Sequence, residues 1–183
     1  MAVREVLQIG HPTLRERSIK ITRFGDGLAA LADDMVETMH DANGVGLAAP
    51  QIGVPRRLIV IEMPDEESYP YPGERWVVCN PEIVKASRET EVGQEGCLSV
   101  AGYVGMVERA TEVVIRGQDL RGHKWRLKAD GYLARVFQHE IDHLDGVLYV
   151  DIAEEQTVMT TEAYDALMAE AQAKEEQEVL DPA

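Results

Sequence analysis

The hexapeptide Gln138-His139-Glu140-Ile141-Asp142-His143 places two histidines four residues apart, with a glutamate directly after the first. Apolar residues recur at helical spacing through the same stretch, which predicts a helix over 132–144. Residues four apart on a helix share one face, so both imidazoles can bind one metal ion while Glu140 carries protons beside them. We expect the rest of the fold to pack around this helix.

The remaining elements indicate segregated rather than alternating helices and strands. We expect a helix over 27–42, a tight buried loop over 44–53, strands over 58–61, 76–79, 112–116 and 124–128, and a last helix over about 161–179. The strand over 76–79 is expected to end at Asn80-Pro81. Because strands and helices do not alternate, the order favours an α+β fold. Short antiparallel sheets would then pack around the central helix, with one N-terminal and one C-terminal helix.

The negative charge of the chain is concentrated at its C-terminal end. Its 183 residues include 33 acids and 18 bases, a net charge of −15. Residues 151–183 hold ten acids and one base, so they carry −9 and residues 1–150 carry −6. Tight nucleic-acid binding and binding to anionic membranes need clustered cations, so neither is expected. No apolar run approaches the ~20 residues that span a bilayer, and no secretory signal is evident, which predicts a cytoplasmic protein.

The two histidines need a third ligand, because a catalytic metal site usually has three protein ligands and one open position. A third histidine is missing at position 149, where Tyr149 stands. Glu162 is one candidate, as in thermolysin-like zinc peptidases, although glutamate is common in this acidic segment. Cys97 is another, because thiolates bind first-row metals strongly, but a lone cysteine is as often a small buried hydrophobe. Cys79 lies in an apolar strand and is predicted to belong to the core.

Three motifs resemble the signatures of the peptide deformylase family. They are Gly44-Val45-Gly46-Leu47-Ala48-Ala49-Pro50-Gln51, Glu95-Gly96-Cys97-Leu98-Ser99 and the hexapeptide at 138–143. The similarity extends over roughly residues 3–151. We therefore expect a catalytic domain over 1–151 and an acidic, mostly helical extension of it over 152–183. The resemblance implies one divalent metal ion bound by Cys97, His139 and His143, with water as the fourth ligand. Iron(II) is the expected native ion, which Zn²⁺, Ni²⁺ or Co²⁺ can replace.

The resemblance also implies a reaction. The substrate would be the formyl group on the N-terminal methionine of a newly made polypeptide, attacked by the water that the metal activates. Glu140 would act as general base and then as general acid. The side-chain amide of Gln51 and the backbone N–H of Leu98 would stabilise the oxyanion.

A further group of residues would contact the substrate. Its members are Val45, Gly46, Tyr132 and Val136. For the last two, which share the helix face of His139, plain core packing is the alternative. Glu95 and Arg109 resemble a structural ion pair of the family. Ala101 and Val104 stand where many relatives have Pro and Arg, so contacts to the downstream part of the substrate are in question.

Two other interpretations stay open. A zinc peptidase would use Glu162 as its third ligand, whereas a catalytically silent relative would only bind metal or formyl peptides. The presence of both Glu140 and Gln51 favours an active enzyme. Its expected partners are N-formylmethionyl nascent peptides, with transient proximity to the ribosome, and the expected oligomeric state is a monomer. The acidic C-terminal segment is unsuited to docking on ribosomal RNA.

Overall fold

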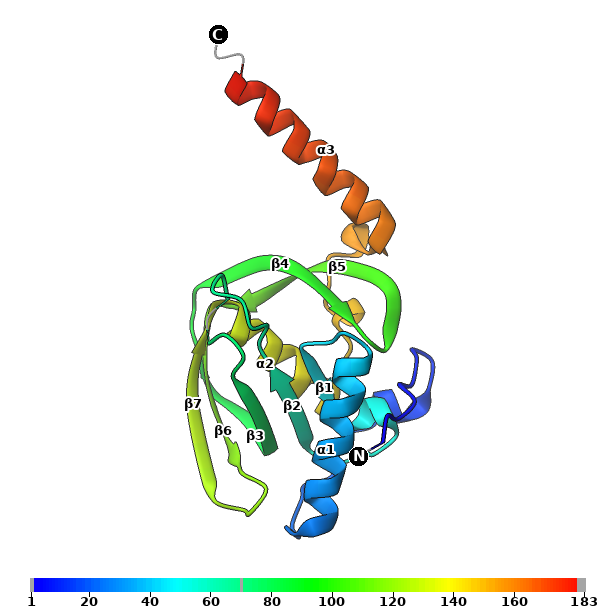
Figure 1. The fold of residues 1–183 in the computed structure, drawn as a ribbon, viewed down its shortest axis with the longest axis vertical. Helices are drawn as coiled ribbons and strands as arrows, with labels where there is room; N and C mark the ends of the chain where they lie inside the picture. The colour runs from blue at the N-terminus through cyan, green and yellow to red at the C-terminus, as the bar shows by residue number, and fades with distance from the viewer. Residues whose placement is uncertain (1, 70, 181–183) are drawn as a thin grey trace.

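The computed structural model describes residues 2–69 and 71–180, which form an α+β fold as expected (Figure 1). This part of the chain contains three α-helices and two antiparallel sheets. The helices are α1 (Asp26–Asp41), α2 (Gly131–Leu144) and α3 (Thr161–Leu180). The strands are β1 (Gly46–Ala48), β2 (Leu58–Glu62), β3 (Arg75–Ala86), β4 (Thr90–Cys97), β5 (Val100–Ala110), β6 (Glu112–Gln118), β7 (Lys124–Asp130) and β8 (Met159–Thr160).

Helix α2, which carries both histidines, packs on a five-stranded sheet with the strand order β1-β2-β3-β6-β7. Its apolar residues recur every three or four positions, so one face of the helix is buried against the sheet. The cluster that joins them includes Leu133, Phe137, Ile141, Ile59, Val78 and Ile115. The other side of α2 faces the second sheet, where His139 contacts Glu95 of β4 and His143 contacts Cys97 at its end.

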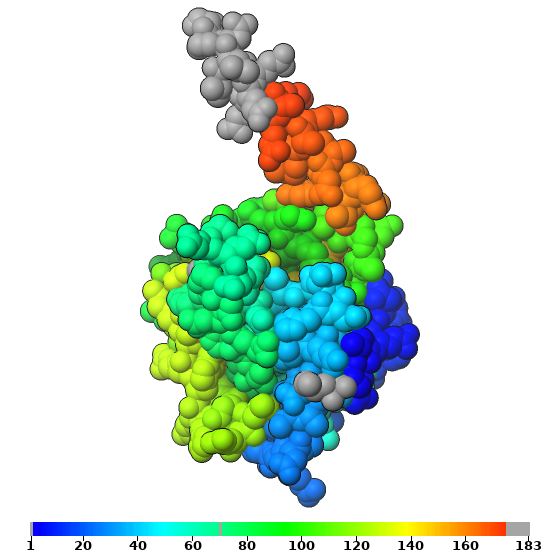
Figure 2. All heavy atoms as spheres, viewed as in Figure 1, coloured from blue at the N-terminus to red at the C-terminus, as the bar shows by residue number. Residues whose placement is uncertain are grey.

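The second sheet has the strand order β4-β5-β8 and is dominated by the long β4–β5 ribbon. This ribbon arches over one end of the body, above α1 and α2 in Figure 1. Helix α3 follows β8 and projects away from the body as a separate rod (Figures 1 and 2). The strongly acidic segment of the sequence therefore lies largely outside the packed body.

The predicted first and last residues of all three helices agree with the structure to within one residue. The helix expected over 27–42 is α1, and its Met35 and Met39 are fully buried against β1 and β2. The helices expected over 132–144 and 161–179 are α2 and α3. No helix in the described residues is long and apolar enough to cross a membrane.

The predicted end of a strand at Asn80-Pro81 is wrong, because β3 continues to Ala86. Asn80 adopts a left-handed φ of 51°, and the pairing of β3 with β6 shifts register between Cys79 and Glu82. The Asn80 side chain exchanges two hydrogen bonds with the backbone of Ile21. The strand thus accommodates the Asn-Pro pair as a β-bulge, with the asparagine side chain supplying partners from outside the sheet.

The buried loop expected over 44–53 is also only partly correct. Gly46–Ala48 pairs with β2 as an edge strand, and a 3₁₀ turn over Ala49–Ile52 follows it. Strands β4, β5 and β8 have no counterpart among the predicted elements. Strand β1 has only three residues, which is too short for an alternating apolar pattern to show in the sequence. Its strand conformation comes from its pairing with β2.

Candidate metal centre

Three predicted ligands meet between α2 and the end of β4. The donor atoms of Cys97, His139 and His143 all lie within 4.8 Å of one another. Cys97 Sγ is 3.2 Å from His143 Nε2, and the two imidazole rings are 4.9 Å apart, inclined at 78°. Both histidines come from consecutive turns of one helix face, and Cys97 comes from the hairpin that joins β4 to β5. The described residues contain no other such group of three His, Cys, Asp or Glu side chains.

This donor set fits a divalent first-row metal. One sulfur and two imidazole nitrogens make three ligands, which leaves a fourth tetrahedral position for water or substrate. His139 uses Nδ1 to bind Glu95 Oε2 at 2.9 Å, which leaves Nε2 for the metal. Glu162 is absent from this group, so a third ligand from the acidic segment is ruled out in favour of Cys97.

A buried network of ion pairs supports His139. Arg109 donates to both carboxylate oxygens of Glu95, at 2.8 and 3.0 Å, and also binds Asp142 at 2.6 Å. Burial would raise the pKa of Glu95, but the hydrogen bonds from His139 and Arg109 outweigh it and lower the pKa to about 2. Glu95 is thus a carboxylate that fixes the ring orientation of a metal ligand. The sequence predicted Glu95 and Arg109 only as an ion pair, and nothing in their spacing to residue 139 signals this contact.

Glu140 lies beside the ligands with one carboxylate oxygen free. Its side chain is buried, and among the described residues Oε2 has no hydrogen-bond partner. Burial raises the pKa of Glu140 to about 7, although the charge of His139 opposes this shift. Gly46 of β1 allows the carboxylate to approach, because a methyl group at position 46 would lie only 2.8 Å from Glu140 Cδ. The carboxyl group is therefore packed closely against the backbone of β1, beside the metal ligands.

Gln51 is oriented by three hydrogen bonds and is almost fully buried. Its Oε1 accepts from the backbone N–H of Ala48 at 2.8 Å. Its Nε2 donates to Ser99 Oγ at 3.2 Å and to Cys97 Sγ at 3.5 Å. The amide hydrogens are therefore directed toward the ligand sulfur. This burial shows that Gln51 is not a solvated loop residue.

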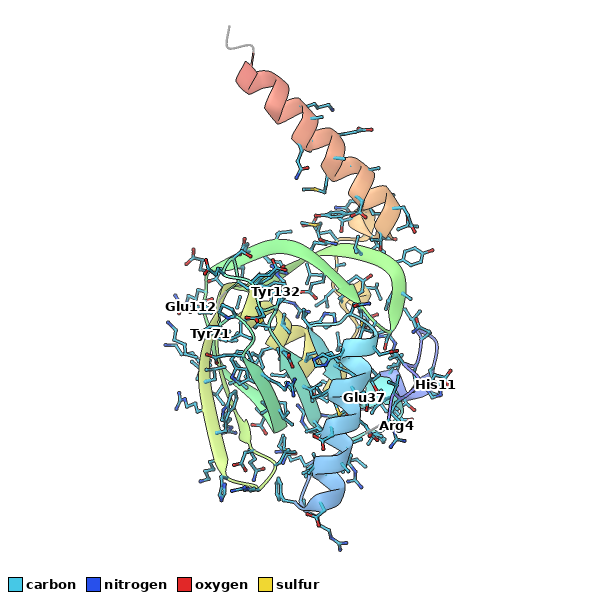
Figure 3. The ribbon with its side chains drawn as sticks, in the orientation of Figure 1. Arg4, His11, Glu37, Tyr71, Glu112 and Tyr132 are labelled. Atoms are coloured by element: carbon cyan, nitrogen blue, oxygen red, sulfur yellow. The ribbon has the colours of Figure 1, made fainter. Side chains whose placement is uncertain are left out.

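A cavity of about 690 Å³ opens in front of these groups. All the residues expected to contact substrate line it: Val45, Gly46, Leu98, Tyr132 and Val136. Tyr132 lies at the start of α2 (Figure 3), and its ring is 5.5 Å from that of Tyr69. Ala101 and Val104 also line the cavity and bring no charge to its wall. The cavity joins the metal ligands to a largely uncharged surface.

Comparison with known proteins assigns the chain to a family. A sequence profile described as "Polypeptide deformylase" matches residues 3–158. The chain belongs to the polypeptide deformylase family. Deformylase activity and a Cys/His/His metal site are therefore properties of this chain. The peptide deformylase of Thermomicrobium roseum is 46% identical over 160 residues, which cover 87% of this chain and 90% of the relative. That of Heliobacterium modesticaldum is 46% identical over 154 residues, 84% of this chain and 96% of the relative.

Solved deformylase structures share the fold. The enzyme of Thermotoga maritima is 38% identical, with a TM-score of 0.78 over 84% of this chain and 99% of that one. A class I type b peptide deformylase of Acinetobacter baumannii, solved with Met-Ala-Ser bound, is 37% identical, with a TM-score of 0.78 over 82% of this chain and 98% of that one. The deformylase assignment thus holds for sequence and for fold.

Proposed function

We propose that this deformylase removes the formyl group from the N-terminal formylmethionine of newly made polypeptides, at the site formed by Cys97, His139 and His143. The observation that carries the proposal is the convergence of these donors with the buried carboxyl group of Glu140 and the amide of Gln51 at one cavity. A bound Met-Ala-Ser tripeptide in the Acinetobacter baumannii relative supports a peptide that begins with methionine. Iron(II) is the proposed native ion, with Zn²⁺, Ni²⁺ or Co²⁺ as substitutes.

The protein supplies a rigid, partly anionic ligand set and the groups that move protons. When bound, the divalent ion supplies Lewis acidity and lowers the pKa of water, so that a nucleophile forms near neutral pH. Glu140, which lines the cavity and whose buried Oε2 has no hydrogen-bond partner among the described residues, takes a proton from the attacking water. It then gives that proton to the departing amine as the C–N bond of the formamide breaks. The products are formate and a free N-terminal methionine.

Two donors of the chain stabilise the negative charge that develops on the formyl oxygen. The Gln51 amide already points toward Cys97 Sγ, beside the position where the reacting carbonyl must sit. The backbone N–H of Leu98, next to the ligand in sequence, is the second donor. Because both donors are held by the fold, little reorganisation accompanies the reaction, and one donor of this kind is worth on the order of 3 kcal/mol.

The substrate is held by an apolar surface and by backbone. Val136 and Tyr132, one and two turns before His139 on α2, contribute to the pocket for the methionine side chain. Val45 and Gly46 border the same cavity at the edge strand β1, where an extended peptide can pair with the backbone. A monomeric state, a cytoplasmic location, transient proximity to the ribosome and the division at residue 151 stay predictions.

The deciding experiment is an anaerobic deformylation assay with metal analysis. We expect release of formate from formyl-Met-Ala-Ser, and no cleavage of acetyl-Met-Ala-Ser or of an internal peptide bond. Cys97→Ala should lose bound metal and activity together, whereas Glu162→Gln should retain both. A zinc peptidase would cleave internal bonds instead. A silent relative would bind formyl-Met-Ala-Ser without releasing formate, and either result would overturn the proposal.

A further inference from the structure

Arg135 is a buried cation close to the metal centre, at the wall of the same cavity. It lies on α2 one turn before His139, and its side chain is buried although the guanidinium is charged. Its Nη1 donates to Glu95 Oε1 at 3.1 Å, to the Val107 carbonyl at 2.8 Å and to the Gly93 carbonyl at 3.3 Å. Its Nη2 donates to the Glu91 carbonyl at 2.8 Å. One guanidinium thus joins α2 to both strands of the β4–β5 ribbon and to the carboxylate that holds His139.

We propose that Arg135 is a positioning residue for the metal centre, which fixes Glu95 in the place from which it orients His139. The inference rests on the metal-dependent function proposed above and adds to it a residue outside the three signature motifs. Arg135 borders the cavity in front of the ligands but is not one of the three metal-ligating residues, and its proposed role is exerted through Glu95. The chain of contacts runs from the Arg135 guanidinium to Glu95 Oε1, and from Glu95 Oε2 to His139 Nδ1.

The topology explains why this contact is needed in addition to Arg109. Glu95 and Arg109 lie on β4 and β5, so they belong to the same ribbon and move together. β4 is an edge strand, paired with β5 alone. The position of Glu95 relative to α2 therefore depends on contacts that cross between the ribbon and the helix. Besides the Glu95–His139 contact itself, two arginine ion pairs do so, Arg109 to Asp142 and Arg135 to Glu95, and the second is the more deeply buried.

The charges of the network require a second guanidinium. Glu95 and Asp142 bring two negative charges and Arg109 brings one positive charge, so Arg135 makes the buried sum zero. Removal of one member of such a group leaves an uncompensated buried charge, which is costly. The unbalanced charge would lie on the carboxylate that accepts from His139, so the ligand itself would be affected.

Gly93 shows that the fold makes room for this contact. A methyl group at position 93 would lie 2.8 Å from Arg135 Nη2 and 2.9 Å from its Cζ. The backbone of Gly93 is not in the left-handed region, so glycine is needed here for space rather than for conformation. Gly93→Ala therefore displaces the guanidinium without removing its charge, which provides an independent perturbation of the same contact.

The test measures metal binding directly, on the full chain. Competition with a chromophoric chelator gives the affinity for Zn²⁺, and the visible spectrum of the Co²⁺-loaded protein reports the ligand geometry. Loss of a group that orients a ligand typically weakens metal affinity 10- to 100-fold. We expect Arg135→Met to weaken Zn²⁺ binding by about 10-fold or more and to alter the Co²⁺ bands, and Gly93→Ala to do the same in milder form. Arg135→Lys should bind Zn²⁺ more tightly than Arg135→Met, because lysine keeps the positive charge but lacks the planar guanidinium with its several N–H donors.

Two comparisons separate positioning from general stabilisation. Arg57 is a matched control, because it is also buried and binds backbone carbonyls, those of Leu144 and Pro81, and a carboxylate, that of Asp145 at 2.7 Å, but does not contact Glu95. Arg57→Met should lower the melting temperature and leave the Zn²⁺ affinity unchanged. If Arg135 acts through Glu95, the double variant Glu95→Gln/Arg135→Met should bind Zn²⁺ no worse than Glu95→Gln alone. Additive losses would overturn the inference.

The remaining outcomes are equally distinct. Wild-type Zn²⁺ affinity and Co²⁺ bands in Arg135→Met, whatever its melting temperature, would reduce Arg135 to a structural contact. If Arg135→Met does not fold, Arg135→Lys and Gly93→Ala decide, and unchanged binding in both refutes the proposal. Failure of the wild-type protein to bind Zn²⁺ or to deformylate formyl-Met-Ala-Ser would instead count against the proposed function.

Discussion

Gly46→Ala tests whether the carboxylate of Glu140, the proposed proton carrier, is positioned by contact with β1. A methyl group at position 46 would lie 2.8 Å from Glu140 Cδ and 3.0 Å from Cγ, and closer still to Oε1. Carbon atoms in good contact are about 3.5–4.0 Å apart, so the carboxylate must retreat by about 1 Å. A misplacement of about 1 Å at a reacting group can cost about 10²-fold in rate. We therefore expect kcat on formyl-Met-Ala-Ser to fall about 10²-fold, which is about 2.7 kcal/mol of activation free energy.

The chain offers a matched control for this variant. Gly96 lines the same cavity, yet a methyl group there would lie 3.6 Å from Val104 Cγ1, an ordinary contact. Neither glycine has a left-handed φ, so alanine suits both backbones. We expect Gly96→Ala to keep wild-type kcat, and both variants to retain one equivalent of Zn²⁺, because neither position holds a ligand. A Gly46→Ala enzyme with wild-type kcat would refute the reasoning, since Glu140 would then not depend on the space that glycine leaves.

Other predictions follow from the same structure. Glu140→Gln should bind one equivalent of Zn²⁺ while kcat falls at least about 10²-fold, and retained turnover would exclude the proton-transfer role. Burial raises the pKa of Cys79 to about 11, so its thiol stays protonated below that pH. Peptide mapping after iodoacetamide treatment at pH 8 should find Cys79 unmodified in the native protein, and labelling there would contradict the buried placement. Phe137→Ala should lower the free energy of unfolding by about 3–5 kcal/mol in urea denaturation, because its fully buried ring lies between those of Trp76 and Trp125.

The sequence predicts the helices of this fold well and its second sheet poorly, for one physical reason. In α2, apolar residues face the sheet at regular spacing, so their period reveals the helix. In β4 the inward positions include Gly93 and Glu95, which face Arg135 and Arg109 instead of an apolar core. A strand with glycine and glutamate on its buried side shows no apolar alternation. The residues of β4 that build the site thus interrupt the apolar alternation by which a strand is recognised in sequence.

The residues of the candidate site also differ in how well the sequence predicts them. The two histidines can be recognised from the sequence, because a spacing of four residues places them on one face of a helix and this spacing is a local property of the sequence. Cys97 lies 42 residues before His139, and chemistry alone left it undecided until the motifs were considered together. Arg135 gives no signal at all, because a single arginine on a helix is usually solvated. Its contacts depend on how β4, β5 and α2 meet, which no local pattern contains.

The distribution of charge explains how so acidic a chain can keep the proposed pocket for an uncharged methionine. Residues 151–183 account for −9 of the net −15, and most of them belong to α3, which projects from the body (Figure 2). Behind the ligands, the two buried guanidinium groups offset the carboxylates of Glu95 and Asp142. Cys97, when it binds a metal ion as a thiolate, brings one further negative charge to the cavity. A divalent cation offsets it, so the donor chemistry and the charge balance of this site favour the same kind of ion.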